Sequence, residues 1–483
     1  MLPRALTTRL WSRLNKEPKP SPFTLSTHPL IATFVCQASN HDSTVLPTKM
    51  ESSRPSDSTQ ISTSPLQLRE ILALVWEYAD VPSFAALCRT CRNVHIPGTE
   101  ILYESVTLDI YGLHEKRLDV FCDTVTNNPN VALLVKKLDL QLCTALTASI
   151  YGKIQDLPDA RTLTKILRAT ENVERLNIDH PYHEITAIQP FGNDLYFPRK
   201  LRLLEFNVCD NKWEAHASGE RDVNTLLLPQ VFGMDALTSV TMTLQQGPAS
   251  PLPEIYLPVQ SSITALTLKE AYLSMESLGN VLQALPHLQH LSLSFLWYAD
   301  PVNSDVGRHL DCEGLARALM QGSPSHLESL SIIVDFDSIA GYDVECGSGP
   351  DSSWGLLHSL GSLKHLNRLR SLVLAPEVLL GWGNVHEAPP LALLLPDSLQ
   401  DLHLRMDFSA WEMTPWKPEP LLGLVGAYLD SIPPHTLLQF TLTYRYTKQE
   451  RVDASSGPVR SKCHNAGCEL RLDMVEKNVA SSS

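Results

Sequence analysis

The most informative segment of the chain reads Leu288-Gln289-His290-Leu291-Ser292-Leu293, a leading leucine followed by two leucines that alternate with polar residues. Ten copies of this spacing occur, some with Val, Ile, Phe or Met in place of leucine, and successive copies start 25 to 42 residues apart. They start at Val135, Val173, Leu201, Leu237, Ile263, Leu288, Leu327, Leu369, Leu399 and Leu437. Ten copies indicate an internal repeat rather than one packed core.

Each copy is expected to form a short strand, because alternate residues of a strand point to the same face. Segments with helical apolar spacing, such as 278–285 and 421–432, lie between copies. The alternation predicts an α/β solenoid, with parallel strands stacked on the concave side of a horseshoe. It resembles an irregular leucine-rich-repeat domain over residues 118–445, with several units longer than the usual ~20–29 residues.

Composition narrows the possible partners. The chain has 483 residues, of which 78 (about 16%) are leucine, and its formal net charge is −14. Because an acidic body repels phosphate backbones, we expect no nucleic-acid partner. No stretch approaches the roughly 18 apolar residues of a membrane helix, so we expect no membrane partner. Ten cysteines without framework spacing are typical of a reducing compartment, here the cytoplasm or the nucleus.

Residues 65–108 differ in texture from the repeats. Three short helices are predicted there, the first with apolar residues at helical spacing from Leu68 to Ala79, and Pro97-Gly98 is expected to end the set. Leu74 and Tyr78 form a second apolar edge on the first helix. Three helices of this size bury little of their own surface, so an apolar face is left over for a partner inside or outside the chain.

Three stretches of this segment form a recognisable set: 70–72 (Glu-Ile-Leu), 78–83 (Tyr-Ala-Asp-Val-Pro-Ser) and 87–92 (Leu-Cys-Arg-Thr-Cys-Arg). Together they resemble an F-box, the motif that binds the Skp-type adaptor of cullin–RING ubiquitin ligases. The Leu-Pro that usually opens the motif is replaced by Gln67-Leu68. The resemblance implies adaptor contacts from Leu68, Ile71, Leu72, Val75, Leu87 and Cys91. The alternative interpretation is a helical cap that shields the first repeat.

The strand pattern also predicts which residues of the repeats face a large ligand. Positions three, five and seven of each copy point out of the concave sheet. Such a face suits a protein target. The residues selected as candidate target contacts are Arg175, Asn177, Ser239, Thr241, Thr267, Ser292, Ser329, Asp401, His403 and Arg405.

Both ends of the chain are expected to be disordered, over residues 1–64 and 446–483. Residues 1–16 carry four cations and no acid, a composition that resembles a mitochondrial transit peptide. Translation from Met50 is the other alternative for this end. Near the other end, Cys463, His464 and Cys468 supply only three potential metal ligands, and a zinc site needs four.

No catalytic or cofactor motif is found. The chain contains no Gly-x-Ser-x-Gly elbow, no phosphate-binding loop and no His-Glu-x-x-His, so we expect neither an enzyme nor a bound cofactor. The resemblance to fungal F-box proteins implies a substrate-recognition subunit of a cullin–RING ligase, bound to the adaptor and the cullin scaffold and to an unknown target protein. The rival interpretation is a leucine-rich-repeat scaffold with a degenerate F-box and no ligase role.

Overall fold

A computed structural model of the chain describes residues 65–90, 92–109, 115–141, 160–181, 196–209, 223–244, 257–258, 262–269, 274–297, 310–322, 326–336, 356–383, 387–406, 416–444 and 450–474. Twelve of its strands form one sheet in which every neighbouring pair is parallel. The order follows the chain, and the strands are β1 (Ser105–Asp109), β2 (Lys137–Gln141), β3 (Arg175–Pro181), β4 (Leu203–Cys209), β5 (Ser239–Thr243), β6 (Ala265–Lys269), β7 (His290–Trp297), β9 (Ser329–Phe336), β11 (Ser371–Leu374), β12 (Asp401–Met406), β13 (Gln439–Tyr444) and β14 (Glu469–Met474). The short strands β8 (Leu310–Asp311) and β10 (Leu356–Leu357) pair separately.

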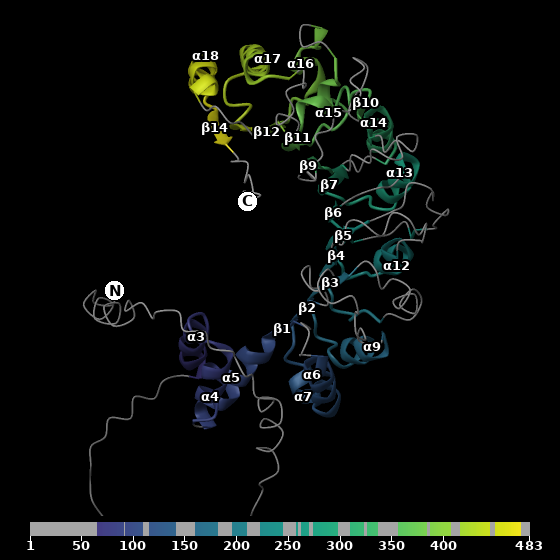
Figure 1. Cartoon of the computed structure of the whole chain (residues 1–483), viewed down its shortest axis with the longest axis vertical. Helices are drawn as coiled ribbons and strands as arrows, with labels where there is room; N and C mark the ends of the chain where they lie inside the picture. The colour runs from purple at the N-terminus through teal and green to yellow at the C-terminus, as the bar shows by residue number, and fades with distance from the viewer. Residues whose placement is uncertain are drawn as a thin grey trace, which may run out of the picture.

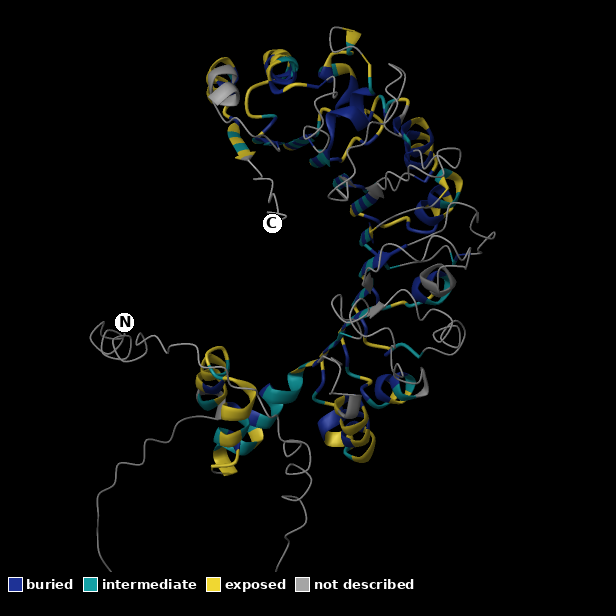
Figure 2. Cartoon of the chain, viewed as in Figure 1, coloured by how far each residue is buried: buried dark blue, intermediate teal, exposed yellow. Residues whose placement is uncertain are grey.

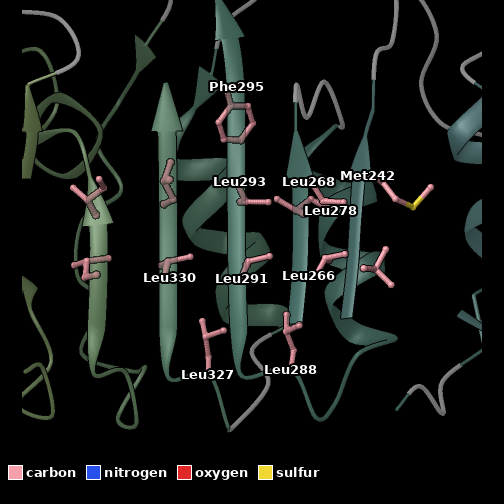
Figure 3. Packing of buried hydrophobic residues seen from close by; sticks show 14 of the residues in the cluster. Met242, Leu266, Leu268, Leu278, Leu288, Leu291, Leu293, Phe295, Leu327 and Leu330 are labelled. Atoms are coloured by element: carbon pink, nitrogen blue, oxygen red, sulfur yellow. The ribbon is translucent and has the colours of Figure 1, made fainter. Parts of the chain in front are cut away.

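Each of the ten repeat copies forms a strand of this sheet, which begins two residues after the leading apolar residue. Leu288 is buried ahead of β7, and Leu291 and Leu293 are buried within it. Figure 3 shows Leu291 in line with Leu266 of β6 and Leu330 of β9, and Leu293 in line with Leu268 of β6. The predicted alternation is confirmed: apolar side chains of successive strands, mostly leucines, stack into rows on one side of the sheet.

Helices cover that apolar side. They are α6 (Glu115–Asn127), α7 (Pro129–Ala132), α9 (Ala160–Ala169), α12 (Val223–Phe232), α13 (Met275–Gln283), α14 (Cys312–Gln321), α15 (Pro376–Leu380), α16 (Leu391–Leu394), α17 (Pro418–Ser431) and α18 (Glu450–Ala466). The strands follow the inner side of an open arc and the helices follow its outer side (Figure 1). The α/β class is therefore confirmed, and the arc is compatible with the predicted solenoid.

The N-terminal helical module consists of α3 (Pro65–Trp76), α4 (Val81–Cys88) and α5 (Arg92–Glu104). Its buried core is small. Trp76 packs edge-on against Phe84, with ring centroids 4.8 Å apart. The buried apolar residues of this core are Leu72, Phe84, Cys88 and Ile101.

The prediction that Pro97-Gly98 ends the third helix is wrong, because α5 continues through both residues to Glu104. Gly98 explains why the helix can pass here: a Cβ at this position would lie 2.3 Å from Cys88 Sγ, so only glycine allows α4 and α5 to approach this closely. Residues 105–108, the end of the segment 65–108 predicted to be helical, instead belong to the first strand of the sheet. No residue separates α5 from β1.

The expected disorder over 446–483 is also wrong for residues 450–474, which form α18 and β14. Val459 and Cys463 of α18 are buried against the core. Leu470 and Leu472 of β14 continue the apolar rows of β13. The apolar pattern of this last strand is incomplete in the sequence, because Gly467 occupies the leading position. At the first strand, Tyr103 occupies the same position. The sheet therefore extends over 105–474 rather than 118–445.

Candidate functional site: two interaction surfaces

Helix α3 exposes apolar side chains to solvent. Ile71 is 51% exposed and Val75 is 38% exposed, and Tyr78, just beyond the helix end, is 87% exposed. With Leu74 these residues lie at i, i+3, i+4 and i+7, which places them on one face; we call these four residues the apolar face of α3. Exposed apolar side chains that are grouped in this way mark binding surfaces, whereas apolar side chains exposed singly are common on any protein surface. Much of the module is exposed (Figure 2).

The structure divides the residues predicted to contact an adaptor. Ile71 and Val75 lie on the apolar face of α3, whereas Leu72 is only 3% exposed and belongs to the module's own core. Leu68 and Leu87 are half-buried against the same core, and Cys91 lies outside the described residues. The first helix is apolar on two sides, so the spacing of apolar residues in the sequence could not distinguish those that face the core from those that face solvent.

Glu104 joins the module to the sheet. Its carboxylate accepts a hydrogen bond from Arg69 of α3 at 3.3 Å and another from Lys136, just before β2, at 3.1 Å. The Glu104 carbonyl oxygen also accepts from the Lys136 backbone N–H at 3.0 Å. The hydrogen bond from Lys136 lowers the pKa of Glu104, and partial burial opposes this shift. One side chain thus ties α3 and α5 to the second strand.

Glu104→Gln should lower the free energy of unfolding, by less than about 1 kcal/mol because the ion pairs are partly exposed. The difference should be larger at pH 7 than at pH 4. Since the folded-state pKa is depressed, the carboxylate stabilises the fold above its unfolded pKa of about 4.3, and this is lost as the pH falls through the folded pKa. Urea denaturation at both pH values measures the difference in the free energy of unfolding between the variant and the unaltered chain. Glu77→Gln, which alters an exposed carboxylate of the same module, is the control. Equal differences at both pH values would contradict the ion-pair assignment.

The concave face of the sheet carries the predicted target contacts. Arg175 and Asp401 are exposed, and the others are half-buried with their side chains on the face opposite the leucine rows. One register row runs across all twelve strands of the sheet. Its residues are Thr107, Asp139, Asn177, Glu205, Thr241, Thr267, Ser292, Ser331, Val373, His403, Thr441 and Arg471.

Hydrogen bonds between strands fix the side chains at the first end of this face. Asn177 Nδ2 donates to Asp139 at 2.9 Å, and Asn207 Nδ2 donates to Asp179 at 2.8 Å. Lys269 Nζ donates in turn to Asn207 at 3.0 Å. A network of this kind holds its members in one arrangement, so a partner meets a preformed polar surface. Sequence spacing gave the positions of these residues but not their connections.

The other end of the face centres on His403. A hydrogen bond of 2.7 Å joins its Nε2 to Thr443 Oγ1. Burial lowers the pKa of His403, Arg405 lowers it further, and Asp473 opposes both. The imidazole is therefore neutral at pH 7 and can donate or accept a hydrogen bond there. Between the two ends, the face consists mainly of small hydroxyl side chains such as Thr267 and Ser292.

In the part of the chain that the structure covers, no group of three or more His, Cys, Asp or Glu side chains could hold a metal ion. Among the same residues, no helix is long and apolar enough to cross a membrane. The two surfaces are thus an apolar helical one and a polar concave one, and both are suited to binding other proteins. In comparisons with known proteins, no family model matches the chain and no curated protein matches it.

Proposed function

We propose that the chain is the substrate-recognition subunit of a cullin–RING ubiquitin ligase. The helical module would be an F-box that binds the Skp-type adaptor, and the arc would be an irregular leucine-rich-repeat horseshoe that binds a target protein. The observation that carries the proposal is the apolar face of α3. Ile71, Val75 and Tyr78 remain exposed on a module whose sequence resembles an F-box.

The junction between the helical module and the sheet supports these two separate roles. Helix α5 runs directly into β1, and Glu104 ties both α3 and α5 to the second strand. A target held on the concave face would therefore be kept at a fixed distance from the adaptor. In such a ligase the recognition subunit supplies proximity, while the chemistry occurs on other subunits.

Purified full-length chain mixed with a purified Skp-type adaptor tests the proposal. We expect a complex of one chain with one adaptor, with a Kd of about 1 μM or tighter, by size-exclusion chromatography and isothermal titration calorimetry. A ternary complex with the cullin scaffold should form through the adaptor. If the folded chain does not bind, the ligase function is wrong and the scaffold alternative takes its place.

A further inference from the structure

Helix α18 ends in a turn that brings two cysteines together. Gly467 has a φ of +68°, its N–H donates to the His464 carbonyl oxygen at 3.1 Å, and the Cys468 N–H donates to the Cys463 carbonyl oxygen at 2.8 Å. This pair of bonds defines a Schellman motif, in which the side chains of the first and last hydrogen-bonded residues normally meet. Here both positions are cysteines.

The two thiols are buried and adjoin each other. Cys463 lies in the last turn of α18, Cys468 immediately precedes β14, and both are free cysteines. The two thiols perturb each other: the neighbouring Cys468 lowers the pKa of Cys463, whereas the neighbouring Cys463, together with burial, raises the pKa of Cys468, whose Sγ also donates to the Glu469 carbonyl oxygen at 3.7 Å. Cys463 therefore forms a thiolate first, with a second thiol beside it.

We propose that Cys463 and Cys468 are a redox modification site, at which a reversible disulfide forms between the last helix and the last strand. The co-reactant is a small disulfide such as oxidised glutathione. The Cys463 thiolate attacks one of its sulfur atoms and releases one reduced glutathione. Cys468 then attacks the mixed disulfide and releases the second. Two cysteine thiols are oxidised, and one glutathione disulfide is reduced to two thiols.

The backbone geometry and the position of the pair both favour this bond. A disulfide needs Cα atoms about 4.4–6.8 Å apart, and the backbone hydrogen bond between these residues holds them within such a reach. Strand β14 is the last strand of the sheet, and its Leu470 and Leu472 are only half-buried. Terminal elements open locally more readily than central ones, which gives a small disulfide access to buried thiols.

Closure of the bond should stabilise one end of the concave face. Glu469, Arg471 and Asp473 of β14 are exposed there and form the last rung beside β13. Linking α18 to β14 limits the opening that would displace these side chains. The site acts independently of the helical module, at the opposite end of the chain.

Full-length protein equilibrated with graded ratios of oxidised to reduced glutathione tests the site. We expect peptide mass spectrometry to show a fragment spanning 463–468 that has lost two hydrogen atoms, reversibly on reduction. Hydrogen exchange of residues 450–474 should slow about tenfold or more in the oxidised form. Cys463→Ser and Cys468→Ser should each prevent both changes, and an intact exchange pattern in β7–β12 would show that these variants fold.

Cys122 and Cys312, which are buried on α6 and α14, provide the comparison within the same molecule. They should remain reduced over the range of ratios that oxidises the pair. Two outcomes would overturn the proposal. One is a stable mixed disulfide with glutathione on either cysteine without ring closure, and the other is no oxidation of 463–468 at any ratio.

Discussion

Aspartate at both Ile71 and Val75 should abolish capture of the Skp-type adaptor by the full-length chain, with a loss of affinity of at least about 100-fold. Both side chains are exposed on the apolar face of α3, so their replacement leaves the core of the module intact. In the complex they would be covered by the partner. Burying two unpaired carboxylates there costs several kcal/mol, which is more than the binding free energy lost by removing the apolar contacts alone.

A matched control is available at the other end of the chain. Leu393 on α16 is 62% exposed, and Leu393→Asp should leave the adaptor affinity unchanged, because it places an aspartate at an exposed apolar position on a different surface. Calorimetry measures the adaptor affinity of the unaltered chain, the double variant and Leu393→Asp, and circular dichroism establishes that each is folded. Undiminished binding by the double variant would show that the adaptor uses another face of the module.

The Leu72→Asp variant distinguishes the effect of altering the core of the module from the effect of altering its surface. It changes the neighbour of Ile71, but its side chain packs with Phe84, Cys88 and Ile101. A carboxylate there should unfold the module and remove adaptor binding through loss of structure. Proteolysis confined to residues 65–104 would identify that cause, whereas the Ile71 and Val75 variant should resist cleavage as the unaltered chain does.

The contrast between Ile71 and Leu72 also explains which features were predictable from sequence. Strand positions were, because alternation in a buried parallel sheet leaves little freedom: a shift of one residue would turn Leu291 and Leu293 to the solvent face. The two faces of α3 were not, because both are apolar and tertiary contacts decide which one is covered. Phe84 and Ile101 cover Leu72, and they come from two other helices.

The outer strands show the same limit. At β1 and β14 the leading position holds Tyr103 or Gly467, so the strongest marker of the repeat is missing although the inward residues remain. In α5, Pro97-Gly98 has the local signature of a helix end, but close packing of Gly98 on Cys88 keeps the helix continuous. Local preferences were overridden in both cases by contacts distant in sequence.

On the concave face, position was predictable and connection was not. The alternation placed Asn177 and His403 on the correct side of their strands. Whether Asn177 meets Asp139, or His403 meets Thr443, depends on rotamers and on the neighbouring strand in register. The preformed network at one end of the face and the neutral histidine at the other emerge only from the folded arrangement.

Leu293→Ala should destabilise the sheet by about 2–5 kcal/mol. Leu293 is fully buried in the centre of β7, between Leu268 of β6 and Ile332 of β9. Truncation leaves a cavity in an apolar row that continues into both neighbouring strands (Figure 3). Urea denaturation followed by circular dichroism measures the change in the free energy of unfolding.

Ser292→Ala is the matched control because it alters the adjacent residue of the same strand on the concave face. Its effect should stay within about 0.5 kcal/mol. Similar losses from the two variants would mean that both faces of the sheet are packed, and the concave side could then not serve as an open binding surface. A large loss for Leu293→Ala with a small one for Ser292→Ala would leave that face free for a target, because stability would reside in the leucine rows behind it.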